Sequence, residues 1–166
     1  MNIDISGIAK LYGTFLDVHF SEEIENLNYS EQKIEFTSPV NVSGIITNLG
    51  QIFIFEGSVH TSFKTICDRC LEEYQSDLDF NISEKFANEQ QNNMDDINVF
   101  HGDTIDLKDA ILSNIILNLP LRFVCSENCK GLCSVCGNNK NIKKCDCKED
   151  NIDPRLEKLK SLFKIN

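Results

Sequence analysis

Eight cysteines in two groups are the feature that most constrains how this 166-residue chain can fold. One pair, Cys67 and Cys70, has the C-x2-C spacing and stands alone. The other six crowd into one short stretch, at Cys125, Cys129, Cys133, Cys136, Cys145 and Cys147. Because four thiolates complete a tetrahedral zinc site, eight cysteines are enough for two closed sites. Such sites hold a fold together and leave no coordination position for a substrate or an activated water.

The spacing favours one partition of these cysteines over its rival. We predict a first set of Cys67, Cys70, Cys125 and Cys129. The second set has the contiguous pattern C-x2-C-x8-C-x-C and consists of Cys133, Cys136, Cys145 and Cys147. The rival partition joins Cys129 to Cys133, Cys136 and Cys145. In the predicted partition, the first site joins two segments that lie far apart in the sequence, whereas the second is self-contained.

Disulfides and reactive thiols are the alternatives to zinc. The first twenty residues show no basic segment followed by a long apolar run, because Asp4, Lys10 and Asp17 interrupt them. No run of about 18 apolar residues occurs, so no membrane span is expected. We therefore predict a cytoplasmic protein whose thiols stay reduced and bind two structural zinc ions. The alternative function is a redox- or metal-responsive regulator whose cysteines release zinc on oxidation.

Three segments alternate apolar and polar residues with period two, which predicts half-buried strands. They span residues 34–47, 53–63 and 74–86, and Asn48 to Gln51 forms the turn between the first two. Pro39 indicates an edge position or a bulge in the first strand. The C-x2-C pair then lies at the tip of a long hairpin. Shorter strands are expected at residues 3–5 and 15–20, and the polar run from Asn88 to Asp96 predicts a loop.

A helix is expected at residues 107–119, with Asp106 as its N-cap and Pro120 after its end. Its apolar stripe consists of Leu107, Ile111, Leu112, Ile115, Ile116 and Leu119. A second, short helix begins at Asp153-Pro154. The predicted fold class is therefore α+β: an antiparallel β-meander packed by one central helix, with a C-terminal Cys-rich zinc-binding module and a short terminal helix.

These elements are expected to form one domain over residues 1–166. Its parts are a β-rich body at 1–120, a zinc module at 121–150 and a helical tail at 151–166. No P-loop, G-x-G-x-x-G or G-x-S-x-G motif occurs, and the three histidines lie singly along the sequence. We therefore expect no enzyme and no small-molecule substrate. An RNA-processing enzyme with unrecognised chemistry is a third hypothesis.

The net charge of −10 is unevenly distributed along the chain. Residues 1–119 carry 6 basic and 20 acidic side chains, whereas residues 120–166 carry 10 basic and 6 acidic ones. The acidic body repels a phosphate backbone, so any direct RNA contact is expected in the C-terminal segment. The candidate contacts are Lys140, Lys143, Lys144 and Lys148. These lysines could equally offset the negative charge of a zinc–thiolate centre.

Four motifs in this order resemble those of the YceD family of bacterial and plastid proteins, also called large ribosomal RNA subunit accumulation proteins. They are Cys67-Asp68-Arg69-Cys70-Leu71, Ile116-Leu117-Asn118-Leu119-Pro120, Cys129-Lys130-Gly131-Leu132-Cys133-Ser134-Val135-Cys136-Gly137 and Asp153-Pro154-Arg155-Leu156. The resemblance implies a role in large ribosomal subunit biogenesis, with large-subunit ribosomal proteins or ribosomal RNA as partners. Some members of the family lack the second cysteine block. The resemblance therefore implies that the site at the hairpin tip matters more to the fold.

Overall fold

A computed structural model describes residues 1–30, 32–88 and 97–147 of the chain. The polar run predicted as a loop, the predicted terminal helix and Lys148 lie wholly or mostly outside these residues. The elements are β1 (Asn2–Asp4), β2 (Phe15–Glu22), β3 (Leu27–Tyr29), β4 (Gln32–Phe36), β5 (Val40–Asn48), β6 (Ile52–Ile66), β7 (Glu73–Asn88), β8 (Asn98–Phe100), β9 (Thr104–Asp106) and α1 (Lys108–Asn118).

The long hairpin of β6 and β7 forms the frame of the main sheet. These strands pair over their full length, from Ile52 opposite Ala87 to Ile66 opposite Glu73. On the other edge of β6 lie β5 and, further along, β4, while β2 pairs with β5 and β3 with β4. The sheet is therefore mainly antiparallel, as predicted. It departs from a simple meander because β2 pairs with β5 rather than its neighbour in sequence, and β8 runs parallel to β7.

The first predicted strand is interrupted at Pro39 and forms β4 and β5. Both strands pair with the same edge of β6, with Phe36 opposite Phe63 and Asn41 opposite His60. Four residues on the β4–β5 side therefore face two on β6, which is a bulge with two extra residues. Because two is a full period of a strand, the side chains before and after the bulge keep the same face.

One face of the sheet forms the hydrophobic core. The residues predicted to share this face from β6 are Phe53, Phe55, Val59 and Phe63, and all four are buried. From β7, Leu78, Ile82 and Phe86 join the same core cluster. The opposite face carries polar side chains, so the sheet has one apolar and one solvated face.

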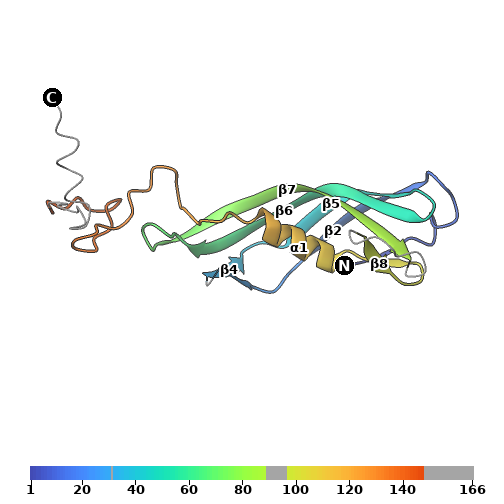
Figure 1. Cartoon of the computed structure of the whole chain (residues 1–166), viewed down its shortest axis with the longest axis horizontal. Helices are drawn as coiled ribbons and strands as arrows, with labels where there is room; N and C mark the ends of the chain where they lie inside the picture. The colour runs from blue at the N-terminus through green and yellow to red at the C-terminus, as the bar shows by residue number, and fades with distance from the viewer. Residues whose placement is uncertain (31, 89–96, 148–166) are drawn as a thin grey trace, which may run out of the picture.

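Helix α1 lies along the sheet, as Figure 1 shows. Its buried residues Ala110, Ile111 and Ile115 belong to the same core cluster as the strand residues. The apolar stripe is narrower than the sequence predicted, because Ile116 is 41% exposed. Asp106 precedes the helix and accepts a hydrogen bond from the Lys108 backbone N–H at 2.9 Å, although the structural N-cap is Leu107.

The molecule is elongated, and the cysteine-rich segment lies at one end of it. In Figure 1 this segment, in orange and red, extends from α1 past the tip of the β6–β7 hairpin. The hairpin tip and the chain after α1 meet there, and the Asp68 N–H donates to the Phe123 carbonyl at 2.7 Å. Among the residues that the structure describes, no helix is long and apolar enough to cross a membrane.

Candidate metal centres

The first cluster joins the hairpin tip to the chain after α1. The hairpin supplies Cys67 and Cys70, and residues 119–129 after α1, here called the exit segment, supply Cys125 and Cys129. Their four sulfur atoms lie within 4.8 Å of one another. Three of these side chains are buried, and Cys125 is exposed. The cluster therefore lies near the surface, with three of its four cysteine side chains shielded from solvent.

The distances between these sulfur atoms fit a metal ion and not a disulfide. Cys67 Sγ lies 3.9 Å from Cys129 Sγ, and Cys70 Sγ lies 3.7 Å from Cys125 Sγ. A disulfide requires about 2.05 Å. Four sulfurs at about 2.3 Å from a central zinc, in a tetrahedron, lie about 3.8 Å apart. The cluster therefore has the donor set and the spacing of a four-coordinate zinc site.

Backbone N–H groups point at the sulfur of Cys67. Those of Arg69 and Cys125 each donate to it at 3.4 Å. Burial raises the pKa of this thiol, but the N–H donors, led by that of Cys125, outweigh it and lower the pKa to about 6. The thiolate is the metal-binding form of cysteine, so the backbone prepares this ligand for a cation.

Asp68 fastens the hairpin tip to its surroundings. Its Oδ2 accepts the Phe123 backbone N–H at 2.8 Å, and its Oδ1 accepts a hydrogen bond from Gln32 of β4. Phe123 is itself buried against the core, with ring centroids 6.1 Å from Phe63 and 6.2 Å from Tyr29. The exit segment is therefore held by packing as well as by the cysteines.

The second cluster consists of Cys133, Cys136, Cys145 and Cys147, whose sulfur atoms also lie within 4.8 Å of one another. The structure thus groups the eight sulfur atoms in the two sets that the spacing predicted, and not in those of the rival partition. This cluster is more accessible than the first, since Cys133 is buried, Cys136 is exposed and the other two are half-buried. Backbone N–H groups of Cys136 and Val135 lower the pKa of Cys133 to about 6.

Both C-x2-C turns use the same backbone hydrogen bonds. In the first, Leu71 N–H donates to the Cys67 carbonyl and Cys67 N–H donates to the Glu72 carbonyl, both at 2.9 Å. In the second, Gly137 N–H donates to the Cys133 carbonyl at 2.9 Å, and Cys133 N–H donates to the Asn138 carbonyl at 2.8 Å. The fifth residue of each turn has a positive φ, 59° at Leu71 and 72° at Gly137. The chain therefore builds the same knuckle twice.

The two clusters are coupled through the residues between them. The Leu132 N–H donates to the Arg69 carbonyl at 3.0 Å. A Cβ on Gly131, whose φ is +67°, would lie 2.9 Å from that same carbonyl oxygen, so only glycine fits there. Asn141, beside the second cluster, donates from Nδ2 to Cys129 Sγ of the first at 3.3 Å. The second cluster is therefore less self-contained than its contiguous pattern suggested.

Sequence reasoning missed Asn141 and assigned no role to Asp68. In the sequence, Asn141 stands out only as a polar residue inside the cysteine block. Ordinary loops also contain such residues, so this signal does not identify a contact to a sulfur atom. Of the candidate nucleic-acid contacts, Lys143 and Lys144 are exposed and Lys140 is half-buried. All three lie in the loop between the second and third cysteines of the second cluster.

The fold and these clusters define a class: a mainly antiparallel β-sheet protein with two four-cysteine clusters at one end. Residues 55–163, more than half of the chain, match the family described as "Large ribosomal RNA subunit accumulation protein YceD". The chain belongs to this family, which confirms the resemblance. Membership supports a role in the accumulation of large-subunit ribosomal RNA.

The chain is also similar to individual proteins, one of which carries the family's name. The chain is 26% identical over 145 residues to an uncharacterised protein, YlbN, of Bacillus subtilis, covering 86% of this chain and 84% of the relative. It is 44% identical over 61 residues to the chloroplastic "Large ribosomal RNA subunit accumulation protein YCED homolog 1" of Zea mays, which covers 36% of this chain and 20% of the relative. No solved structure matches the chain.

Proposed function

We propose that the protein binds two structural zinc ions, one in each four-cysteine cluster. The spacing of the sulfur atoms in the first cluster supports this, because it equals that of a zinc tetrathiolate. The N–H groups directed at Cys67 Sγ support it as well. A closed site of this kind supplies folding energy and offers no position for catalysis.

The protein acts, in this proposal, as a non-catalytic factor in large ribosomal subunit biogenesis in the cytoplasm. The observation that best supports this proposal is the presence of two four-cysteine clusters in a member of the YceD family. Large-subunit ribosomal proteins or ribosomal RNA are the proposed partners. In the depression lined by His19 and His60, Ser43 and Ser58 hydrogen-bond to each other at 3.1 Å, which does not favour a serine activated by a histidine.

A complementation experiment tests this proposal. Cells lacking the protein should show a lower ratio of large- to small-subunit ribosomal RNA, restored by the wild-type gene but not by Cys70→Ser. The matched control is Ser83→Ala, a conservative change at an exposed position of β7 opposite Glu56, thirteen residues beyond Cys70 in sequence. Zinc analysis of the purified proteins should give two ions for the control. An unchanged RNA ratio in the null cells rejects the ribosomal role, whereas a metal-free wild-type protein rejects zinc.

The exposure of the second cluster favours one second candidate, a redox-responsive regulator. Cys136 is exposed and Cys145 and Cys147 are half-buried, so an oxidant can reach these sulfurs. In this case Cys147→Ser should leave the RNA ratio normal in unstressed cells and abolish only its response to hydrogen peroxide. Under the main proposal, peroxide makes no difference between the variant and the wild type.

A further inference from the structure

Strand β2 forms an open edge of the main sheet. Within the described part of the chain it pairs only with β5, over eight residues from Phe15 opposite Thr47 to Glu22 opposite Val40. Its other edge carries a row of backbone N–H and C=O groups, and no strand formed by residues 1–30, 32–88 or 97–147 lies beside them. Natural edge strands usually carry lysine, proline or a bulge that blocks further pairing. β2 contains no lysine and no proline and pairs without a break.

The core side of β2 is incompletely covered. Val18 is 2% exposed, but Leu16 and Phe20, which share its face, are only half-buried. Both pack against the main core from its margin. One more strand along β2 would extend the core over these two side chains, because its alternate residues would project to the same face.

The same edge is acidic. Asp17, Glu23 and Glu25 are exposed between residues 15 and 25, and this stretch contains no lysine or arginine. It belongs to the body of the protein, where acidic side chains outnumber basic ones by 20 to 6. A nucleic acid would be repelled here, whereas a lysine- or arginine-rich polypeptide would be attracted.

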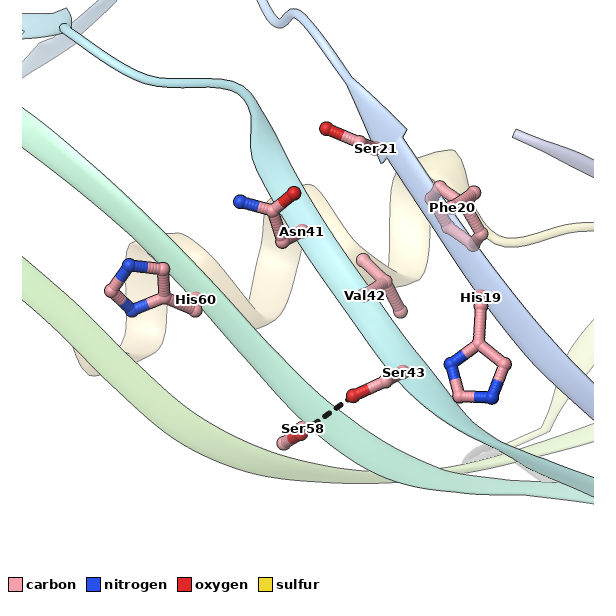
Figure 2. Close-up of a pocket in the computed structure, with 8 residues that line it drawn as sticks. All are labelled: His19, Phe20, Ser21, Asn41, Val42, Ser43, Ser58 and His60. Carbon is pink, nitrogen blue, oxygen red and sulfur yellow. Dashed lines mark hydrogen bonds between the residues drawn. The ribbon is translucent and has the colours of Figure 1, made fainter.

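A shallow depression of about 430 Å³ lies on the solvated face next to this edge. Figure 2 shows it crossing from His19 and Ser21 of β2 to Ser58 and His60 of β6. Beside it, His60 Nδ1 lies 2.5 Å from the carboxylate of Asp79. Hydroxyl and carboxylate oxygens here can accept hydrogen bonds from an ammonium or guanidinium group, and a lysine or arginine side chain is long enough to reach across β2.

From these observations we infer that β2 docks an extended, basic polypeptide segment as an additional strand. The partner segment alternates apolar with basic residues. Its apolar side chains cover Leu16 and Phe20, while its basic ones face Asp17 and the depression. Backbone hydrogen bonds supply the pairing, and this alternation supplies the specificity. The inference needs neither the zinc ions nor a ribosomal role.

A peptide experiment tests this surface on the full-length protein. The probe is a capped octapeptide alternating lysine and valine. One control peptide has the same composition in the order Lys-Lys-Val-Val, and another alternates glutamate and valine. At low salt, only the alternating lysine peptide should bind with appreciable affinity. Binding should slow amide hydrogen exchange in residues 15–22 at least about fivefold and leave the exchange of β7 unchanged.

A charge-reversal variant supplies the second measurement. Asp17→Lys with Glu23→Lys should weaken binding of the lysine probe at least about tenfold, because it removes the attraction and places lysine on the edge. The matched control, Asp103→Lys with Asp109→Lys, makes the same change in net charge at two exposed positions outside the main sheet and should bind nearly as the wild type does. Equal weakening in both variants, or no binding of the lysine probe, overturns the inference. So does strong protection of residues 15–22 before any probe is added.

Discussion

The fifth residue of each C-x2-C knuckle needs a positive φ, and the two residues found there, Leu71 and Gly137, adopt it at different cost. Leu71 and Gly137 both have a positive φ, a region that costs a residue with a Cβ about 1–2 kcal/mol. Leu71 is 62% exposed, so its side chain gains little from packing. Strain of this kind persists only where the surrounding structure enforces it, as the hydrogen bonds of Cys67 do here.

Exchanging these residues should therefore have opposite effects. Leu71→Gly should stabilise the protein by about 0.5–1 kcal/mol, since relief of strain exceeds the added entropy of the unfolded chain. Gly137→Leu should weaken zinc binding at the second cluster about tenfold, because the knuckle closes less readily. Thermal unfolding and competition with a chelator measure the two effects. If Leu71→Gly destabilises the protein, the leucine side chain makes a contact that outweighs its strain.

Asp68 is the second residue with a specific expectation. Asp68→Ala removes the acceptor for the partly buried Phe123 N–H and should cost about 1–2 kcal/mol. The melting temperature should fall by about 3–6 °C. Asp79→Ala is the matched control. Among the contacts of the described residues, the Asp79 carboxylate pairs only with the exposed His60. Its removal should therefore lower the free energy of unfolding by less than about 1 kcal/mol. Equal losses in both variants would place the anchoring of the exit segment elsewhere.

At the scale of elements, sequence patterns located the strands that have one apolar face. Alternation identified the buried positions Phe53, Val59 and Ile82, and spacing identified both cysteine clusters. Among the three-residue strands, β1 was expected near residues 3–5, but β3, β8 and β9 were not, because three residues give little periodic signal and their pairing depends on distant partners. The exposure of Ile116 was missed for a similar reason. Periodicity shows which face of a helix is apolar, but it does not show how much of that face the sheet covers.

The two clusters should differ in their effect on the elements around them. The first joins the β6–β7 hairpin to the segment after α1, whereas the second lies within one loop region. Cys70→Ser should therefore remove one zinc ion and lower the melting temperature of the whole protein by more than about 10 °C, since a structural zinc supplies several kcal/mol.

Cys147→Ser is the matched variant at the second cluster. It should also remove one zinc ion, but it should increase hydrogen exchange mainly after residue 130. The link from Asn141 to Cys129 predicts a small additional effect on the first cluster. Metal analysis, thermal unfolding and segment-resolved hydrogen exchange check these outcomes. A global loss of equal size from both serine variants would contradict the distinction between the clusters.

At the scale of the whole molecule, charge separates two ends with different expected partners. The body carries a net charge of −14 over residues 1–119, and the C-terminal part carries +4 over residues 120–166. A zinc tetrathiolate adds about −2 at each site, because four thiolates outweigh one divalent cation. With zinc bound as proposed, Lys140, Lys143 and Lys144 in the loop of the second cluster would lie beside this negative charge, which would weaken their attraction for phosphate.

Lys143 and Lys144 are the exposed lysines through which direct RNA contact is expected to run. Lys143→Glu with Lys144→Glu should then weaken binding to a large-subunit ribosomal RNA fragment at least about tenfold, and affinity should fall steeply as salt is raised. The control reverses charge in the body, with Lys33→Glu and Lys85→Glu, and should change affinity little. Filter binding at several salt concentrations measures both variants. An equal loss in both pairs would mean that net charge alone, and not the second cluster, governs the interaction. If the wild type shows no affinity while it still copurifies with large-subunit proteins, the contact is with protein, and the acidic body is the better candidate surface.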